Sequence, residues 1–441
     1  MPDPSRLTAT VATRLIREGK LRPEALTEAC LDRIAGREEK VRAFAWFDAA
    51  AARRNAAAAH PGPLSGLPLG VKDVLDTADM PSEYGSPIWC GWRPRADAAS
   101  VAWARAAGAV VIGKTVTTEF ATRKPGPTAN PHRLTHTPGG SSSGSAAGVA
   151  DFFFPLAFAT QTGGSVIRPA AFCGTVGYKP SFGTIHRAGM KIMSESLDTI
   201  GVIARSVADC ALLVAAVSAT ELGDPEKRID RPPKIGICRS PSWKSAAPET
   251  GSLFERVAEA LRRAGASLVE RELPAACEQL TLAHPVIMNA ESARAMGWEL
   301  AHARSEISDL LLERLESGLA QDAASIAAAA ATFVEAQRAF PQVLAGLDVL
   351  LTPSAPGEAP EGLGATGDPA FNFIWTSLHV PCVTVPAGVG PTGLPLGIQL
   401  VGREGDDRAM LACAAWVAAA VEGVGSGAVT REMAAGTEAA V

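Results

Sequence analysis

The stretch Thr137–Ser181, TPGGSSSGSAAGVADFFFPLAFATQTGGSVIRPAAFCGTVGYKPS, is the most informative part of this chain. Two turns of small residues, 139–144 and 160–165, bracket an apolar segment. Glycine lets the backbone approach a ligand closely, and consecutive small residues can direct their N–H groups toward one point, which suits a developing anion. Ser165 ends the second turn. The pattern therefore predicts a serine nucleophile beside an oxyanion hole.

Two flexible loops are the alternative interpretation of these turns, because glycine and serine mark loops in general. The apolar run Phe152–Ala159 between the turns argues against it. Such a run is expected to be buried, whereas a linker would lie in solvent.

A serine nucleophile needs a base. No histidine lies close to Ser165 in the sequence, but Lys72 lies in the apolar, strand-like run Leu67–Val74. Burial disfavours an ammonium group and lowers a lysine pKa from about 10.4 toward neutrality. A buried Lys72 is therefore a candidate base, and a surface lysine at a strand end is the alternative.

These segments resemble the amidase signature enzymes. The resemblance is carried by GVKD at 70–73, PGGSSSGSAAG at 138–148 and TQTGGSVIRPAAFCGTVGYKPS at 160–181, and it extends over most of the chain. The family's two serines match positions 141 and 165, which are 24 residues apart (165 − 141). The resemblance implies that Ser165 is the nucleophile, that Ser141 is a bridging serine after a cis peptide bond, and that Lys72 is the base.

These roles predict amide hydrolysis through an acyl-enzyme. Lys72 takes a proton from Ser141, Ser141 takes one from Ser165, and Ser165 Oγ attacks the amide carbonyl. The relay returns a proton to the leaving amine, and water completes the hydrolysis. The expected oxyanion hole consists of the backbone N–H groups of Thr162, Gly163, Gly164 and Ser165. No cofactor and no metal ion are expected.

Two residues are candidate substrate contacts, Arg168 and Gly140. Arg168 follows the nucleophile by three positions, and a guanidinium there can hold a substrate carboxylate through two hydrogen bonds. A structural arginine is the alternative. Trp375 and the loop around Asn372 are candidate pocket walls, and for Trp375 a core position is the alternative.

Within the family the chain resembles malonamidase-type amidases, through DTADMPSEYGS at 76–86, GKTVTTEFATR at 113–123 and the segment 350–375. This resemblance implies a small amide that bears a carboxylate, such as malonamate. Gln161 stands where many family members have Asp, as in that subgroup, but the GTVGY stretch at 174–178 looks more like other amidases. A glutamine-hydrolysing subunit of a tRNA-dependent amidotransferase, which works with partner subunits, and a catalytically silent binding subunit remain alternatives.

Two motif matches point to other classes of enzyme. Residues 108–115, GAVVIGKT, match the P-loop of nucleotide hydrolases, but the residues between the glycines read as a strand and not as a turn. Residues 140–144 match a nucleophile elbow, but no strand-like segment precedes them. An esterase built on that elbow would need a histidine base, for which the candidates are His186, His284, His302 and His379. The lysine interpretation predicts that replacing each of these histidines singly leaves turnover largely intact.

Composition narrows the class of protein. The chain has 441 residues, of which 47% are hydrophobic, so it can bury a large core. Its net charge of −5 argues against a nucleic acid as the main partner. The eight cysteines form no C-x-x-C pair, and neither a signal peptide nor a membrane span is apparent. We expect a cytoplasmic enzyme that acts on a small amide, and the resemblance also implies that a homodimer can form.

Alternating strand and helix patterns, together with the resemblance, predict a single α/β domain over residues 1–441, with a mixed central sheet covered by helices on both faces. Ser5 is the expected cap of a helix over Ser5–Glu18, and Ser206 with Asp209 matches a capping box. The expected organisation is N-terminal helices in 1–60, a catalytic core in 64–210, a helical insertion over the site in 280–345, and a frayed tail in 423–441.

Overall fold

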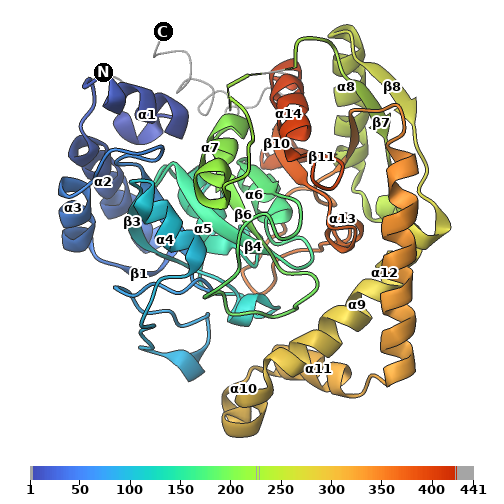
Figure 1. Ribbon diagram of the computed structural model, residues 1–441, viewed down its shortest axis with the longest axis horizontal. Coiled ribbons are helices and arrows are strands. Elements are labelled where there is room, and N and C mark those ends of the chain that lie inside the picture. Colours follow the sequence, from blue (N-terminus) through green and yellow to red (C-terminus); the bar gives the residue numbers. More distant parts are fainter. Residues whose placement is uncertain (1–2, 225, 228, 423, 425–441) are drawn as a thin grey trace.

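The fold is an α/β domain built on one large mixed sheet. The computed structural model describes residues 3–224, 226–227, 229–422 and 424. Within these residues the strands join into an 11-stranded sheet in the order β1-β3-β2-β4-β6-β5-β10-β11-β9-β7-β8, with helices packed against it (Figure 1). The tail expected to fray falls outside the described residues, except for Val424.

The strands combine parallel and antiparallel pairs, as the sequence predicts. In chain order they are β1 (Phe44–Phe47), β2 (Pro68–Lys72), β3 (Val110–Thr115), β4 (Leu156–Gln161), β5 (Val176–Lys179), β6 (Thr199–Ala204), β7 (Lys234–Ile237), β8 (Ser267–Glu270), β9 (Val349–Pro353), β10 (Cys382–Val389) and β11 (Pro395–Val401).

The helices alternate with the strands through most of the chain. They are α1 (Ala9–Arg17), α2 (Pro23–Val41), α3 (Ala49–Ala57), α4 (Ala99–Ala106), α5 (Ser143–Ala150), α6 (Ile167–Cys173), α7 (Val207–Ser218), α8 (Pro248–Arg263), α9 (Ala275–Ala295), α10 (Gly297–His302), α11 (Asp309–Leu319), α12 (Ala323–Val343), α13 (Phe373–Ser377) and α14 (Asp407–Val421). Short 3-10 turns are η1 (Pro4–Arg6), η2 (Pro87–Trp89), η3 (Glu119–Ala121), η4 (Pro241–Ser245) and η5 (Arg304–Glu306).

Strand β2 carries Lys72 into the interior. It lies between β3 and β4 and runs parallel to both, and all five of its residues are buried. Parallel strands with both faces covered read as continuous apolar runs, which is why Leu67–Val74 predicted a strand. A polar side chain in such a strand has to find its partners inside the protein.

The predicted cap of the first helix is wrong. Helix α1 starts after Thr8, whose side chain accepts a hydrogen bond from Val11 N at 3.4 Å. Ser5 lies in η1, because Pro4 starts that short turn, and its hydroxyl donates to Asp3 at 2.8 Å. The cap of this helix therefore lies three residues later than the sequence pattern indicates.

The second predicted cap is confirmed in part. Ser206 Oγ accepts a hydrogen bond from Asp209 N at 3.0 Å and so caps α7. The reciprocal bond of a capping box is replaced by a tertiary contact, since Asp209 Oδ1 accepts from Thr10 N at 2.8 Å. This contact joins the first helix of the chain to α7.

Helices α9 to α12 form the block that the sequence placed in 280–345. In Figure 1, α10 and α11 extend away from the sheet while α9 reaches back toward it. A hydrophobic cluster joins α9, α12 and α13, and it includes the fully buried Trp375, whose ring lies 6.0 Å from that of Phe340. Trp375 is therefore a core residue, which is the alternative that the sequence leaves open beside a pocket wall.

Helix α14 is joined by hydrogen bonds to residues at the end of β5. Asp407, the first residue of α14, accepts hydrogen bonds from Tyr178 Oη at 2.5 Å, from Ser181 N at 2.9 Å and from Ser181 Oγ at 2.5 Å. Tyr178 belongs to β5, which directly follows α6. Helix α14 thus packs beside α7 and α8 (Figure 1) and is tied by its first residue to the end of β5.

Two features of the described residues bear on the environment of the chain. No helix among them combines the length and the apolar character needed to cross a bilayer. Cys90 is exposed, and the other seven cysteines are buried, in keeping with their role as small core residues.

Candidate active site

Lys72 ends strand β2 and is completely buried. Its Nζ lies 2.7 Å from Ser141 Oγ and 2.7 Å from Thr160 Oγ1. Burial lowers the pKa of Lys72 to about 7, and the charge of Asp198 opposes this shift. The interpretation of Lys72 as a surface residue is therefore wrong: near neutral pH much of it is a neutral amine in contact with Ser141.

Ser141 lies in the first glycine-rich turn and is buried. The Gly140–Ser141 peptide bond is cis, as the family resemblance implies. Its neighbour Ser142, the centre of the apparent nucleophile elbow, accepts a hydrogen bond from Thr160 N and donates one to Thr160 O, both at 3.3 Å. Ser142 therefore joins the two turns, and no described strand leads into it as an elbow requires.

The second turn presents unpaired backbone donors. Among the described residues, none accepts a hydrogen bond from the N–H groups of 162–165. Three successive carbonyls of the same turn are paired: Thr162 O with His284 Nε2 at 2.8 Å, Gly163 O with Thr376 Oγ1 at 2.8 Å, and Gly164 O with Arg168 N at 2.9 Å. Because N–H and C=O point in opposite directions across a trans peptide, these bonds leave the following N–H groups free to bind an anion.

The side chains of Gln161 and Thr162, at the N-terminal end of this turn, also fix its position. Gln161 Oε1 accepts from Val166 N at 3.0 Å and from Ile167 N at 3.1 Å, which satisfies the start of α6. Thr162 Oγ1 donates to Asp198 Oδ1 at 2.5 Å. The turn that contains Ser165 is thus fixed by side chains on both sides.

Ser165 is 9% exposed. The hydrogen bonds among the described residues include none between Ser165 Oγ and Ser141 Oγ. The two turns are nevertheless side by side, because Arg168, one helical turn after Ser165, donates from Nη2 to Gly140 O at 2.6 Å. The structure thus forms the Lys72–Ser141 contact and leaves the contact between the serines open.

Arg168 is buried without an acidic partner in hydrogen-bonding contact. Its Nη2 also lies 3.2 Å from Thr366 Oγ1, while Nε and Nη1 have no hydrogen-bond partner among the described residues. Burial lowers the pKa of Arg168 to about 10. Gly140, the other predicted substrate contact, has its carbonyl occupied by Arg168, and a side chain there would meet Thr366 at 2.6 Å.

Asn372, near which the sequence places a pocket wall, lies against the nucleophile turn. A Cβ added at Gly164 would come within 2.2 Å of Asn372 Oδ1, so only glycine fits there. Asn372 Nδ2 donates to Ser354 O at 3.2 Å, while Oδ1 is buried and has no hydrogen-bond partner among the described residues.

The P-loop match is structural. Its Lys114 lies in β3, fully buried, with Nζ 2.9 Å from Asp73 Oδ1, 2.9 Å from Leu75 O and 2.5 Å from Ser82 Oγ. A lysine held by internal partners in a strand cannot reach a nucleotide phosphate. The prediction that residues 108–115 are not a P-loop is therefore confirmed.

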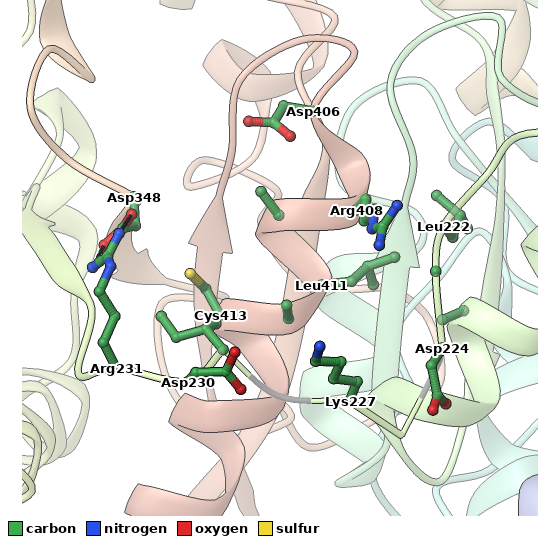
Figure 2. A pocket seen from close by; sticks show the side chains of 15 residues that line it. Leu222, Asp224, Lys227, Asp230, Arg231, Asp348, Asp406, Arg408, Leu411 and Cys413 are labelled. Atoms are coloured by element: carbon green, nitrogen blue, oxygen red, sulfur yellow. Dashed lines mark hydrogen bonds and ion pairs between the residues drawn. The ribbon is translucent and has the colours of Figure 1, made fainter.

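A separate cavity of about 610 Å³ lies beside α14 (Figure 2). Its lining includes Asp224, Lys227, Arg408 and the ion pair of Arg231 with Asp348 at 2.6 Å. None of the predicted site residues lines it. The cavity is therefore distinct from the cluster around Lys72, where the buried amine and the unpaired backbone donors lie.

Sequence reasoning missed four side chains of this site. Asp198, Thr376 and the positioning contact of His284 carry no motif, because each acts through a backbone group or a side chain distant in the sequence. Thr160 lies in the 160–165 turn, but nothing in the sequence shows its contact with Lys72. The one available signal is the place of Thr160 directly after the apolar run Phe152–Ala159, at the end of the buried strand β4.

Comparison with known proteins shows the family to which the chain belongs. Residues 25–411 match the amidase family. The chain is 32% identical to a glutamyl-tRNA(Gln) amidotransferase subunit from Roseiflexus castenholzii, over 92% of this chain and 94% of the relative. The crystal structure of an amidase is 30% identical, with a TM-score of 0.86 over 94% of this chain and 99% of that one. The peptide amidase of Stenotrophomonas maltophilia is also 30% identical, with a TM-score of 0.76 over 92% and 94%. The chain therefore belongs to the amidase signature family and is an enzyme that acts on amide C–N bonds.

Proposed function

We propose that Ser165 Oγ attacks the amide carbonyl and that Ser141 and Lys72 carry its proton. The observation that carries this proposal is the buried amine of Lys72, with a pKa of about 7, at 2.7 Å from Ser141 Oγ. An amine that is neutral near pH 7 can accept a proton, which an ordinary lysine cannot. The contact between the two serines closes when substrate binds, because catalytic hydrogen bonds often tighten only in that complex.

The same relay serves the leaving group. An amide nitrogen departs only after it is protonated, and the proton first taken from Ser165 returns to it through Ser141. The C–N bond then breaks, ammonia or an amine leaves, and the acyl group remains on Ser165. Water attacks this ester through the reverse proton path and releases the acid. Every proton taken is thus returned without a cofactor.

The negative charge of the tetrahedral intermediate falls on the carbonyl oxygen. The N–H groups at 163–165 supply its donors, since their peptide carbonyls are held on the opposite side. A single donor of this kind contributes about 3 kcal/mol to the stability of the transition state, judged by removals in other enzymes. The Thr162 N–H is a fourth candidate donor.

The substrate is an amide that carries a carboxylate. Arg168 supports this, because a buried guanidinium with two unpaired nitrogens beside Gly140 lacks the anion it would normally hold. A carboxylate that accepts a hydrogen bond from Nη1 would satisfy one of these unpaired nitrogens.

Two carboxylated amides fit this description. Glutamine comes first, because the relative from Roseiflexus castenholzii belongs to an amidotransferase; the chain would then release ammonia from glutamine and work with partner subunits. Malonamate comes second, because Arg168 lies one helical turn from Ser165 and touches Gly140, which favours a short distance between the amide and the carboxylate.

An ammonia-release assay separates these substrates. The purified chain is offered glutamine, malonamate and propionamide, which lacks the carboxylate, and each is repeated with Arg168→Ala. We expect wild type to prefer a carboxylated amide and Arg168→Ala to lose that preference. Release from malonamate by the chain alone would favour the free-standing hydrolase, and release from glutamine only with partner subunits present would favour the amidotransferase. A preference for propionamide would remove the carboxylate contact from the proposal.

A different measurement tests whether the chain is a catalytically silent subunit. A fluorophosphonate reacts with an activated serine, forming a P–O bond while fluoride leaves. We expect mass spectrometry to find this adduct on Ser165 and to find none after Ser165→Ala. An unlabelled wild-type chain would contradict the proposed mechanism.

A further inference from the structure

His284 reaches the nucleophile turn from outside. It lies in α9, is completely buried, and stacks on Phe373 with ring centroids 4.5 Å apart. Its Nε2 lies 2.8 Å from Thr162 O. A carbonyl can only accept a hydrogen bond, so Nε2 carries the hydrogen. Burial lowers the pKa of His284 to about 4, and the ring is therefore neutral at neutral pH.

The bond to Thr162 O determines the direction of the next N–H group. Thr162 O and Gly163 N–H belong to one peptide unit, and the two point in opposite directions because that unit is planar and trans. A donor that holds Thr162 O toward α9 therefore turns the Gly163 N–H away from α9. Thr376 Oγ1 does the same for the next unit through Gly163 O at 2.8 Å.

Without the hydrogen bonds from His284 and Thr376, the peptide units of this turn could rotate. Gly163 and Gly164 have no Cβ to restrict their dihedral angles, and rotating the Thr162–Gly163 unit would exchange an N–H for a carbonyl oxygen at the oxyanion. A carbonyl dipole there would repel the developing charge. The turn is therefore a place where one hydrogen bond from another element decides whether the donors face the substrate.

We infer that His284 is a positioning residue for the oxyanion hole, which holds the Gly163 N–H toward the reacting carbonyl. The inference rests on the proposed function, and it gives the helical block that begins with α9 a direct link to turnover. His284 does not act as the base, because its protonated nitrogen is committed to Thr162 O and its Nδ1 has no hydrogen-bond partner among the described residues.

This inference revises one expectation from the sequence. Replacing any of the four later histidines was predicted to leave turnover largely intact. That prediction stands for His186, His302 and His379, but we now expect His284 to be the exception. His379 is a matched control, since it also stacks on a phenylalanine, Phe182, at 4.2 Å and bonds through Nε2 to a carbonyl, Ser196 O, at 2.8 Å.

The test compares His284→Leu, which removes the donor at similar size, with His284→Gln, whose amide can still donate to Thr162 O, and with the control His379→Gln. Loss of a whole oxyanion donor lowers kcat by about 100- to 1,000-fold in other enzymes, and a misdirected donor should lose part of this. We therefore expect a fall in kcat of roughly 10- to 100-fold for His284→Leu, with KM and the midpoint of the pH profile unchanged. His284→Gln should recover most of the loss, and His379→Gln should resemble wild type.

A second measurement does not depend on knowing the substrate. The rate at which a fluorophosphonate labels Ser165 also requires donors for a developing P–O⁻ group, so it should fall in His284→Leu and recover in His284→Gln. Should the leucine variant not fold, His284→Asn, whose amide is one methylene too short for Thr162 O, replaces it. Equal labelling rates in wild type and in the donor-less variant would overturn the inference, whereas a wild-type chain that is not labelled would overturn the proposed function instead.

Discussion

Replacing Lys72 by methionine should abolish most of the activity and should remove a pH-dependent contribution to stability. Methionine has a similar length and no charge, so it fits the buried position at the end of β2. The base is lost, and kcat should fall by about 100- to 10,000-fold, the usual contribution of general acid–base catalysis. The wild-type kcat/KM should rise with pH and level off above about pH 7, because Lys72 must lose its proton to act.

The effect on stability follows from the two pKa values of Lys72. The ordinary value is 10.5 and burial lowers it to about 7 in the folded protein. Between these values the unfolded chain binds more protons than the folded chain, so the contribution of Lys72 to the free energy of unfolding rises with pH. Integrated from pH 7 to pH 9, with half of Lys72 protonated at the start, this rise is about 2 kcal/mol.

Methionine at position 72 removes this dependence. Urea unfolding of both proteins at pH 7, 8 and 9 measures it, because contributions from all other groups cancel in the difference between them. We expect the stability of the variant relative to wild type to fall by about 2 kcal/mol between pH 7 and pH 9. The variant also loses the hydrogen bonds to Ser141 and Thr160. This loss changes the difference in unfolding free energy between variant and wild type by the same amount at pH 7, 8 and 9. A difference that does not change with pH would refute a depressed pKa, and with it the role of Lys72 as the base.

Three further changes test the surroundings of the site. Asp198→Asn should move the midpoint of the pH–activity profile to lower pH, since the Asp198 charge raises the pKa of Lys72; a shift to higher pH would contradict this. Thr160→Val should move it in the same direction, because the variant loses an acceptor 2.7 Å from the ammonium form, and an unchanged profile would show that Thr160 does not tune the base. Lys114→Met should destabilise the fold by about 3–5 kcal/mol, because it leaves Asp73 buried and unpaired; this is measured by urea unfolding, and a loss below about 1 kcal/mol would contradict a buried ion pair.

Much of the site could be predicted because its parts have local signatures. Lys72 stands in a run whose apolar character on both sides of the lysine indicates a covered parallel strand, and the structure buries it. The two serine turns contain several small residues each, and few other patterns have that composition. The family resemblance is carried by the segment around Lys72 and by the two serine turns, and it implies that the three act together in one site. Periodicity alone would not have indicated this.

The remainder could not be predicted because it depends on pairs that only the fold creates. His284 and Thr376 are 122 and 213 residues away from the carbonyls they hold, and nothing around them in the sequence differs from an ordinary helix. The cap at Thr8 shows the same limit on a smaller scale, since Ser5 and Thr8 both offer a hydroxyl and Pro4 decides between them. For Trp375 the sequence leaves a pocket wall and a core position open, and packing against Phe340 places it in the core.

The attachment of α14 by Asp407 has a consequence for how the enzyme is made. Tyr178 and Ser181 are translated long before Asp407, and until that residue leaves the ribosome the end of β5 has no partner at this point. Thr376 likewise emerges about two hundred residues after the glycine whose carbonyl it holds. We expect a nascent chain stalled before residue 400 to resist labelling at Ser165, so that hydrolysis begins only after α14 has been made.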